Sequence, residues 1–402
     1  MKIIHTSDWH IGQNLYNLDR KEEHDSMVEQ LSELVRNEKP DALVIAGDIY
    51  DVSVPNTTAQ KSLAEYLVKV HDAHPSMVIV CISGNHDSAS RHEIFQTPWE
   101  ALGVKMIGKI DSEDFAPNVI YLPGKGVIVA VPYTNERFLN EEFYASLEQY
   151  VSEAVRGAEG FEGAEGLPIV YVGHAAIKEC NYEGHRVVEE KYVGGIECTD
   201  INELGSLYDY VALGHIHKAQ TFNGGKARYS GTPVPVSFDE VREGYEHSFS
   251  VVEIDSHGAV PAIRTVEVTP VKELVNIPTE GAAKWDDVMG ELKDFSAERK
   301  AYLRLNVLIG QGESIPYNRE ELIKGALLGK EAVWVELNSV REEIKVEDAE
   351  NAGATLRLNI DELQKIDPID IMKAYAGVNF KDEYSKMLNE ILQKLEDEDN
   401  EN

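Results

Sequence analysis

Side chains that bind metal ions or transfer protons follow five apolar segments of the chain. One such place is the sequence GNHD at 84–87, which comes directly after the apolar run MVIVCI. Carboxylates, amides and imidazoles are ligands of divalent metal ions, and they also act as general acids and bases. The candidates, in chain order, are Asp8, His10, Asp48, Asp51, Asn85, His86, Asp87, His174, His215 and His217.

The apolar segments before these residues have the length and composition of buried β-strands. Segments with helical periodicity stand between them, such as the one in which Leu63, Tyr66 and Val70 recur at helical spacing. This alternation predicts a layered α/β domain over residues 1–265, in which helices cover a largely buried sheet. The predicted strands lie at 2–4, 42–46, 77–82, 126–131, 168–172 and 210–213, and the last lies at 249–255.

The position of the candidate residues at strand ends favours a single shared site. In open α/β sheets, ligand sites form at the carboxyl ends of the strands, where the loops converge. A glycine precedes the polar residue in four of the five places and allows a sharp turn and a close backbone approach. A single Gly-Asp or Gly-His pair is usually only a turn. Five such places in order predict one metal site.

The rest of the chain divides into two smaller parts. Residues 270–350 alternate helical and strand patterns and predict a compact α+β cap domain. Residues 360–402 predict a C-terminal helical pair with apolar side chains at helical spacings. These side chains are Ile369, Ile371, Met372, Tyr375, Tyr384, Met387, Leu388, Ile391 and Leu395.

Composition limits the classes of protein to which the chain can belong. Its 402 residues are too many for a single core, so two or three domains are expected. The sequence has no unbroken apolar membrane span and no signal peptide at its N-terminus. Cys81, Cys180 and Cys198 form no disulfide pattern and predict reduced thiols in a cytoplasmic protein.

The charge of the chain is strongly negative. A formal net charge of −33 argues against nonspecific adhesion to nucleic acids or to anionic membranes. An anionic substrate must therefore be held by positive charge that is concentrated locally, either by metal ions or by a partner.

The ordered motifs D-x-H, G-D, G-N-H-D, G-H and G-H-x-H resemble those of the calcineurin-like metallophosphoesterases. The resemblance implies two adjacent divalent metal ions that share Asp48. Mixed carboxylate, amide and imidazole ligands suit manganese, and also iron or zinc. One ion would be bound by Asp8, His10 and His217, and the other by Asn85, His174 and His215.

The same resemblance implies roles in phosphodiester hydrolysis. A hydroxide that bridges the two metal ions would attack phosphorus, and His86 would act as general acid on the leaving oxygen or stabilise the transition state. Phosphoprotein phosphatases pair their catalytic histidine with a carboxylate at the position of Asp51, so we expect the Asp51 side chain to orient His86. Those phosphatases continue with Arg-Gly, whereas this chain has Val52 and Ser53.

Three longer stretches resemble the SbcD family, the nuclease subunits of bacterial SbcCD complexes. They are MKIIHTSDWHIGQNLYNLDR at the N-terminus, GDIYDVSVPN at 47–56 and YSGTPVPVSFDE at 229–240. The resemblance implies a manganese-dependent DNA nuclease for DNA end processing, replication and recombination repair. Its expected activities are a 3′-to-5′ exonuclease on duplex ends and an endonuclease on single strands and hairpins. Archaeal and eukaryotic relatives have histidine where Asp51 stands, so the roles of that histidine do not transfer.

The SbcD resemblance also implies partners. The ATPase SbcC would dock on the C-terminal helices at 360–402, although packing of these helices on the cap domain alone is an open alternative. A homodimer would form through 57–74 and 88–102, which ordinary core packing explains equally well. Two other functions stay open: a metallophosphodiesterase for small molecules, and a non-catalytic scaffold with the phosphoesterase fold.

Overall fold

The structure is a computed structural model of the chain. It describes residues 1–94, 96–134, 139–178, 180–181, 199–241, 244–310 and 313–342. The chain divides into two units, residues 1–342 and 343–402. The predicted helical pair at 360–402 and the third cysteine, Cys198, therefore lie outside the described residues, and Cys81 and Cys180 are free thiols.

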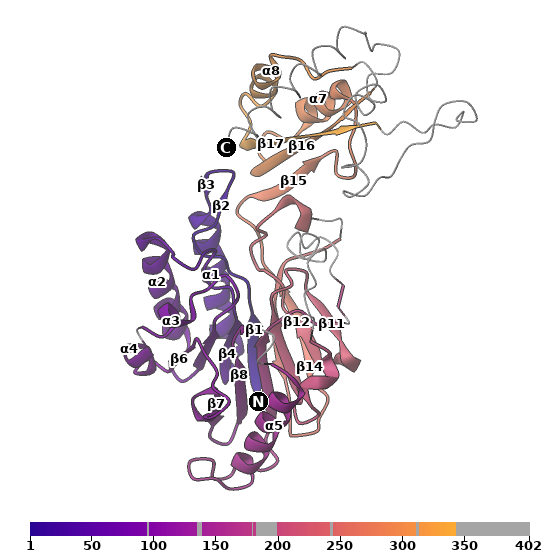
Figure 1. Ribbon diagram of the computed structural model, residues 1–402. Coiled ribbons are helices and arrows are strands. Elements are labelled where there is room, and N and C mark those ends of the chain that lie inside the picture. The colour runs from indigo at the N-terminus through magenta and orange to yellow at the C-terminus, as the bar shows by residue number, and fades with distance from the viewer. Residues whose placement is uncertain are drawn as a thin grey trace, which may run out of the picture. The chain divides into compact units, whose positions relative to one another are not determined.

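The first unit contains a six-stranded mixed sheet that includes the N-terminus (Figure 1). The pairs β1–β4, β4–β5 and β5–β6 are parallel, and β13 and β14 add antiparallel strands beside β1. In spatial order the strands are β14 (Ala262–Glu267), β13 (Ser248–Glu253), β1 (Lys2–Thr6), β4 (Ala42–Ala46), β5 (Val78–Ile82) and β6 (Val104–Ile107).

A second six-stranded sheet is built from the middle of the chain. The pairs β8–β9, β9–β10 and β10–β12 are parallel, whereas β7 and β11 pair antiparallel at the two edges. In spatial order the strands are β11 (Gln220–Phe222), β12 (Ala227–Tyr229), β10 (Tyr210–Gly214), β9 (Ile169–His174), β8 (Gly126–Val131) and β7 (Val119–Leu122).

The two sheets pack face to face. Successive side chains of a strand point to opposite faces, so a central strand contributes side chains to two different cores. On β4, Val44 belongs to the core between the sheets, together with Ile128 and Val170 of the second sheet. Its neighbours Leu43 and Ile45 belong to the core on the outer face of the first sheet. Each central strand is therefore buried on both faces, which explains its continuous apolar sequence.

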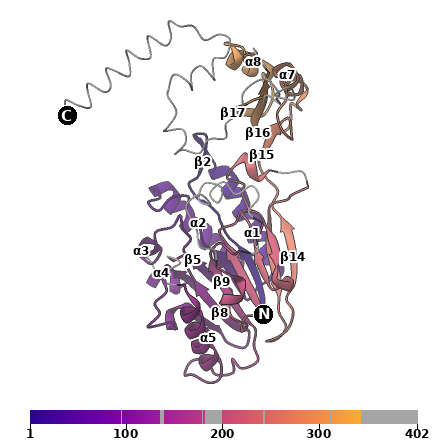
Figure 2. The ribbon, with the colours of Figure 1, turned by 45° about the vertical axis from the view of Figure 1, so that its right-hand side comes forward.

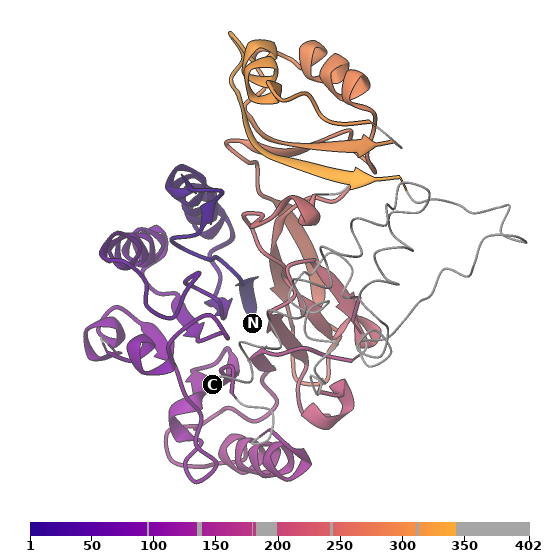
Figure 3. The ribbon, with the colours of Figure 1, turned by 45° about the horizontal axis from the view of Figure 1, so that its top comes forward.

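Helices cover the outer face of each sheet. Helices α1 (Lys21–Glu38) and α2 (Thr57–Ala73) lie on the same outer flank (Figure 3) and pack on the first sheet, and α5 (Glu141–Val155) packs on the second. Asparagine begins two of these helices. The side chain of Asn56 accepts a hydrogen bond from Ala59 N, and that of Asn140 accepts one from Phe143 N.

Helix α5 lies close to β8 and β9 (Figure 2). The remaining elements of this region are β2 (Asn14–Leu15), β3 (Leu18–Asp19), α3 (Ala89–His92), α4 (Gln96–Glu100), η1 (Ala116–Asn118), η3 (Ile201–Leu204), η4 (Asn223–Gly225) and η5 (Phe238–Glu240).

The layered α/β prediction is confirmed, with two corrections. The domain holds two stacked sheets instead of one, since a strand that is buried on both faces carries no mark of the sheet to which it belongs. The predicted last strand at 249–255 corresponds to β13 and is not the last, because β14 follows it at the sheet edge. Most residues of β14 are exposed or half-buried, so its sequence is not apolar.

Residues 273–342 form a separate layer that we call the accessory lobe. Its three parallel strands are β15 (Glu273–Ile277), β16 (Ala301–Ile309) and β17 (Ala332–Arg341), and β15 was not predicted. Helices α7 (Trp285–Asp294) and α8 (Arg319–Ala326) contribute Val288, Leu292 and Ile323 to its core. Within the residues that the structure describes, no helix has the length and apolarity needed to cross a membrane.

The buried His5 of β1 makes stability depend on pH. Its Nδ1 lies 2.9 Å from the Tyr210 hydroxyl and its Nε2 lies 3.2 Å from the Leu213 carbonyl oxygen. Burial, together with the nearby Arg228 charge, lowers the pKa of His5 to about 3. In the unfolded chain His5 therefore binds a proton as the pH falls below about 6.5, whereas in the folded chain it stays neutral down to about pH 3. The contribution of His5 to stability is present above pH 6.5 and is lost as the pH falls towards 3.

We expect His5→Gln to reduce this acid sensitivity in metal-free protein. Glutamine can donate to Leu213 and accept from Tyr210, but it does not titrate. His5 alone changes the free energy of unfolding by up to about 1.4 kcal/mol per pH unit. Urea unfolding at pH 7, 6 and 5 measures this slope. Equal slopes for the original chain and the variant would contradict the assignment.

Candidate metal centre

The carboxyl ends of β1, β4, β5, β9 and β10 bring all seven predicted metal ligands together. Backbone hydrogen bonds join the loops that follow these strands: Asp8 N donates to Gly47 O at 2.9 Å, and His10 N donates to Asp48 O at 3.0 Å. His215 N donates to the Asp8 carboxylate at 3.0 Å, which links the loop after β10 of the second sheet to the loop after β1 of the first.

The backbone is strained at four of these residues. Asp8, His10, Asp48 and His215 have φ angles of 53°, 48°, 49° and 102°, in the left-handed region that favours glycine. Each such residue costs on the order of 1–3 kcal/mol and persists only where the surrounding structure enforces it. Strain of this kind clusters at functional sites, and here four of the eight described non-glycine residues with positive φ are among the predicted metal ligands.

The first potential metal group consists of Asp8, His10 and His217. One ligand atom from each lies within 4.8 Å of the others, and all three residues are buried. The Nε2 atoms of His10 and His217 are 3.1 Å apart. Two neutral imidazoles that point their lone pairs at one another repel, so this arrangement requires a cation or a proton between them.

The second group consists of Asp48, His174 and His215, with Asn85 beside them. The Asn85 Oδ1 atom lies 3.0 Å from His174 Nε2 and 2.9 Å from His215 Nδ1. His174 Nδ1 lies 2.8 Å from the Ala46 carbonyl, which only accepts, so Nδ1 carries the proton in neutral His174. In the neutral form, His174 Nε2 would therefore carry the lone pair that a metal ion requires, beside the Asn85 oxygen.

Electrostatics favour positive charge at this centre. Burial lowers the pKa of His174, but the Asp48 carboxylate 3.4 Å away raises it more, to about 9. Burial likewise raises the pKa of Asp48, yet His174 and His10 bring it well below the ordinary range. The carboxylate thus stays ionised and attracts cations. The donor set and its charge fit divalent metal ions.

The structure corrects the predicted pairing of Asp51 with His86. The Asp51 carboxylate lies 3.3 Å from His10 Nδ1, outside hydrogen-bond geometry, whereas the Asp51 backbone carbonyl lies 2.8 Å from His86 Nδ1. The reason is the path of the loop. Asp51 N donates to Ile11 O at 3.3 Å, so the Asp51 side chain lies beside the segment that carries His10.

Comparison with known proteins assigns the family. A model of the calcineurin-like phosphoesterases matches residues 1–219, more than half of the chain. The SbcD subunit of the nuclease SbcCD from Rhodobacter capsulatus is 30% identical over 312 residues, which cover 73% of this chain and 75% of the relative. The chain belongs to the SbcD family. It is accordingly a metal-dependent nuclease, a hydrolase of phosphodiesters.

Other members of the SbcD family are similarly distant. The Escherichia coli K12 protein is 27% identical over 325 residues, which cover 76% of this chain and 78% of the relative. The Bacillus subtilis protein is 31% identical over 268 residues, which cover 63% of this chain and 66% of the relative. The predicted resemblance to the family is thereby confirmed.

Sequence reasoning missed the residue that holds His217. Glu240 Oε1 lies 2.8 Å from His217 Nδ1, and Glu240 Oε2 accepts a hydrogen bond from Val236 N at 3.0 Å. Burial lowers the pKa of His217, but Glu240 raises it more, to about 9. Glu240 ends the stretch YSGTPVPVSFDE, which marks the SbcD resemblance, but nothing in that pattern pairs Glu240 with His217.

Asp87, the last residue of GNHD, connects two loops of the metal centre through its carboxylate. Its carboxylate accepts hydrogen bonds from Ile49 N at 3.1 Å, Tyr50 N at 2.9 Å and Gly84 N at 2.9 Å. These bonds join the loop after β4 to the loop after β5. Asp87 therefore sets the relative position of Asp48 and of the GNHD loop.

Gly84 is required because the GNHD loop passes directly against Asp48. A Cβ atom at Gly84 would lie 2.1 Å from Asp48 Oδ1 and 2.2 Å from Asp48 N. To make room for it, the backbone at Asp48 or at residue 84 would have to shift. We expect Gly84→Ala to weaken metal binding by about 10-fold to 100-fold, the range seen when the support of a metal ligand is disturbed. Titration of Mn²⁺ by calorimetry measures this change.

The matched control for Gly84 is Gly290 in α7. A Cβ atom there has no neighbour within 4 Å, so Gly290→Ala should leave metal binding unchanged and raise stability by up to about 1 kcal/mol. Metal affinity retained in Gly84→Ala would show that the loop yields easily, against our expectation.

Proposed function

We propose that the chain is the nuclease subunit of an SbcC-type ATPase complex and cleaves DNA with manganese. The proposed activities are 3′-to-5′ exonuclease cleavage of duplex ends and endonuclease cleavage of single strands and hairpins, in DNA end processing, replication and recombination repair. The observation that carries the proposal is the cluster of three overlapping potential metal groups, two of which include Asp48, in a chain of the SbcD family. The proposed place of action is the cytoplasm.

Seven residues hold the metal ions in this proposal. Asp8, His10 and His217 would hold one ion and Asn85, His174 and His215 the other, and Asp48 would supply a carboxylate to this centre. When bound, two divalent ions supply Lewis acidity that polarises phosphoryl oxygens and lowers the pKa of water. They also supply the local positive charge that an acidic chain needs in order to hold a phosphodiester.

His86 acts as the general acid or stabilises the transition state. Its Nδ1 donates to the Asp51 carbonyl at 2.8 Å, and its backbone N donates to Asp48 Oδ1 at 2.8 Å. These bonds fix the ring beside His10, at 4.9 Å between ring centroids. With Nδ1 committed to the carbonyl, Nε2 is the atom that transfers a proton to the leaving oxygen.

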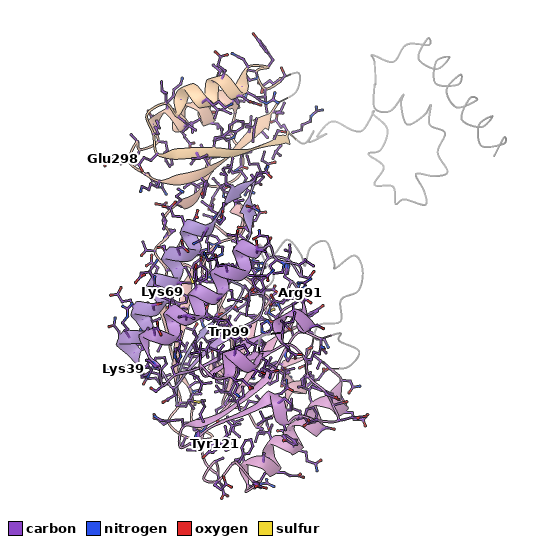
Figure 4. All side chains as sticks on the ribbon, turned by 90° about the vertical axis from the view of Figure 1, so that its left-hand side faces the viewer. Lys39, Lys69, Arg91, Trp99, Tyr121 and Glu298 are labelled. Atoms are coloured by element: carbon purple, nitrogen blue, oxygen red, sulfur yellow. The ribbon has the colours of Figure 1, made fainter. Side chains whose placement is uncertain are left out.

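A homodimer and an SbcC-type partner complete the proposal. The proposed dimer surface comprises the segment 88–102 and helix α2, and in its described part Val68 is 40% exposed and Ile94 is 60% exposed. Lys69, Arg91 and Trp99 appear on the face that is turned to the viewer in Figure 4. The docking of SbcC on residues 360–402 is proposed from the sequence pattern alone, because these residues lie outside the described part of the chain.

The test is a cleavage assay with the full purified chain. End-labelled, hairpin-capped duplex DNA is incubated with Mn²⁺, with and without the SbcC-type ATPase and ATP, and parallel reactions contain a chelator or a small chromogenic phosphodiester. We expect metal-dependent cleavage of the DNA. Hydrolysis of the small diester without cleavage of DNA under any condition would favour the small-molecule phosphodiesterase. No hydrolysis of either substrate would favour the scaffold.

A further inference from the structure

A short segment before β13 contacts the metal centre on one side and the accessory lobe on the other. We define the strap as residues 234–241, which contain the single turn η5. Glu240 at one end of η5 contacts His217, and its side chain is only 8% exposed. The preceding residue, Asp239, accepts a hydrogen bond at 2.7 Å from Arg304 of β16.

The accessory lobe holds the strap at three points. Arg304 Nη1 donates to Asp239 Oδ1, and the Arg304 guanidinium stacks over the Phe238 ring at 5.3 Å from its centroid. Asn276 of β15 donates to the Phe238 carbonyl at 3.2 Å and accepts from Arg304 Nε at 2.7 Å. Phe238 is buried in a small cluster with Leu15, Leu274 and Tyr302.

The other side of the strap fixes the orientation of His217. Both Glu240 oxygens are in use, one toward His217 Nδ1 and the other toward Val236 N, so the carboxylate cannot rotate without breaking a contact. The Glu240 carboxylate only accepts, which keeps a proton on Nδ1 and makes Nε2, 3.1 Å from His10 Nε2, the nitrogen that would bind a metal ion.

The strap also touches the loop that carries Asp8 and His10. Gln13 Nε2 donates to Val236 O at 2.8 Å, and the buried Arg20 donates to Pro235 O at 3.0 Å. Arg20 in turn lies 5.6 Å from the centroid of the Tyr302 ring of the accessory lobe. Two of the loops at the metal centre thus meet the lobe through the same short segment.

We propose that the strap couples the accessory lobe to the metal centre. Glu240 positions His217, and Arg304 of the accessory lobe holds the strap in place. A change in the position of the lobe, such as a partner or a DNA duplex would impose, alters the first metal group through this coupling. The inference rests on the proposed metal role of His217.

Calorimetric titration of Mn²⁺ into the metal-free full chain tests the coupling without any DNA. We expect Glu240→Gln, which keeps the shape but removes the charge, to weaken binding about 10-fold to 100-fold. Arg304→Ala should weaken binding by at least about twofold, and it should have no further effect in the Glu240→Gln background, because coupled residues are not additive. Thermal unfolding of each metal-free variant checks its folding.

Arg299→Ala is the matched control. Arg299 is also an arginine of the accessory lobe, but it pairs with Glu273 and stacks on Phe295 away from the strap, so its variant should bind Mn²⁺ normally. Should Arg304→Ala fail to fold, Arg304→Lys takes its place, since lysine lacks the fork that reaches both Asn276 and Asp239.

The outcomes separate this inference from the proposed function. Failure of the unmodified chain to bind Mn²⁺ would overturn both. Normal binding by the unmodified chain with unchanged affinity in Glu240→Gln, or with additive effects in the double variant, would overturn the coupling alone.

Discussion

Asp48→Asn is expected to abolish detectable DNA cleavage and to weaken binding of divalent metal by more than about 100-fold, beyond the losses seen for residues that only support a ligand. Asp48 belongs to two of the three potential metal groups, one with His10 and the other with His174 and His215, so its loss affects both. Asparagine has nearly the same shape and can still accept from His86 N at the place of Asp48 Oδ1, but it cannot balance the charge of a cation.

Calorimetry with Mn²⁺ and the DNA cleavage assay measure the effect of Asp48→Asn. Asp41→Asn is a suitable control, since Asp41 is an aspartate one residue before β4 that pairs with Lys125 and Lys2 N instead of the centre. An Asp48→Asn chain that binds two equivalents of Mn²⁺ as tightly as the unmodified chain would rule out the shared role of Asp48.

His86→Asn is expected to slow DNA cleavage by about 10²-fold to 10⁴-fold, the usual contribution of a general acid. Metal affinity should change less than cleavage, because His86 is not among the seven proposed ligands, although one of its ligand atoms lies within 4.8 Å of those of His10 and Asp48. Asparagine can still donate to the Asp51 carbonyl but has no atom at the place of Nε2. Single-turnover rates, measured together with Mn²⁺ titration, separate loss of chemistry from loss of metal.

Asp51→Asn provides the comparison for His86. The variant keeps the backbone carbonyl that orients His86, so we expect a much smaller loss than for His86→Asn, exerted through the neighbouring His10. Nearly full activity in His86→Asn would remove His86 from the mechanism. A loss in Asp51→Asn as large as that in His86→Asn would instead support a direct pairing of the two side chains.

The convergence of the seven proposed ligands could be predicted from the sequence, because each follows a strand whose identity is clear. The apolar runs before Asp48 and Asn85 define β4 and β5, and parallel strands bring their carboxyl ends to one edge. The division of the strands into two sheets could not be predicted, since a strand such as β4 and one such as β9 are equally apolar on both faces.

The contacts between side chains in the metal centre were harder to predict than the list of residues that come together there. Asp51 was expected to use its carboxylate toward His86, but the course of the loop presents its carbonyl there and its carboxylate to His10. Glu240 lies 23 residues after His217, in a strap whose path no local pattern defines. The left-handed backbone of Asp8 and Asp48 is likewise imposed by the packing of the loops, and it cannot be predicted from the residue type alone.

Anomalous diffraction from crystals of the full chain soaked with Mn²⁺ tests the central claim most directly. We expect two manganese peaks about 3.5–4 Å apart. One peak should lie beside Asp8, His10 and His217, the other beside Asn85, His174 and His215, and Asp48 should contact both. A single peak, or peaks away from these side chains, would contradict the two-metal centre on which the proposed nuclease activity depends.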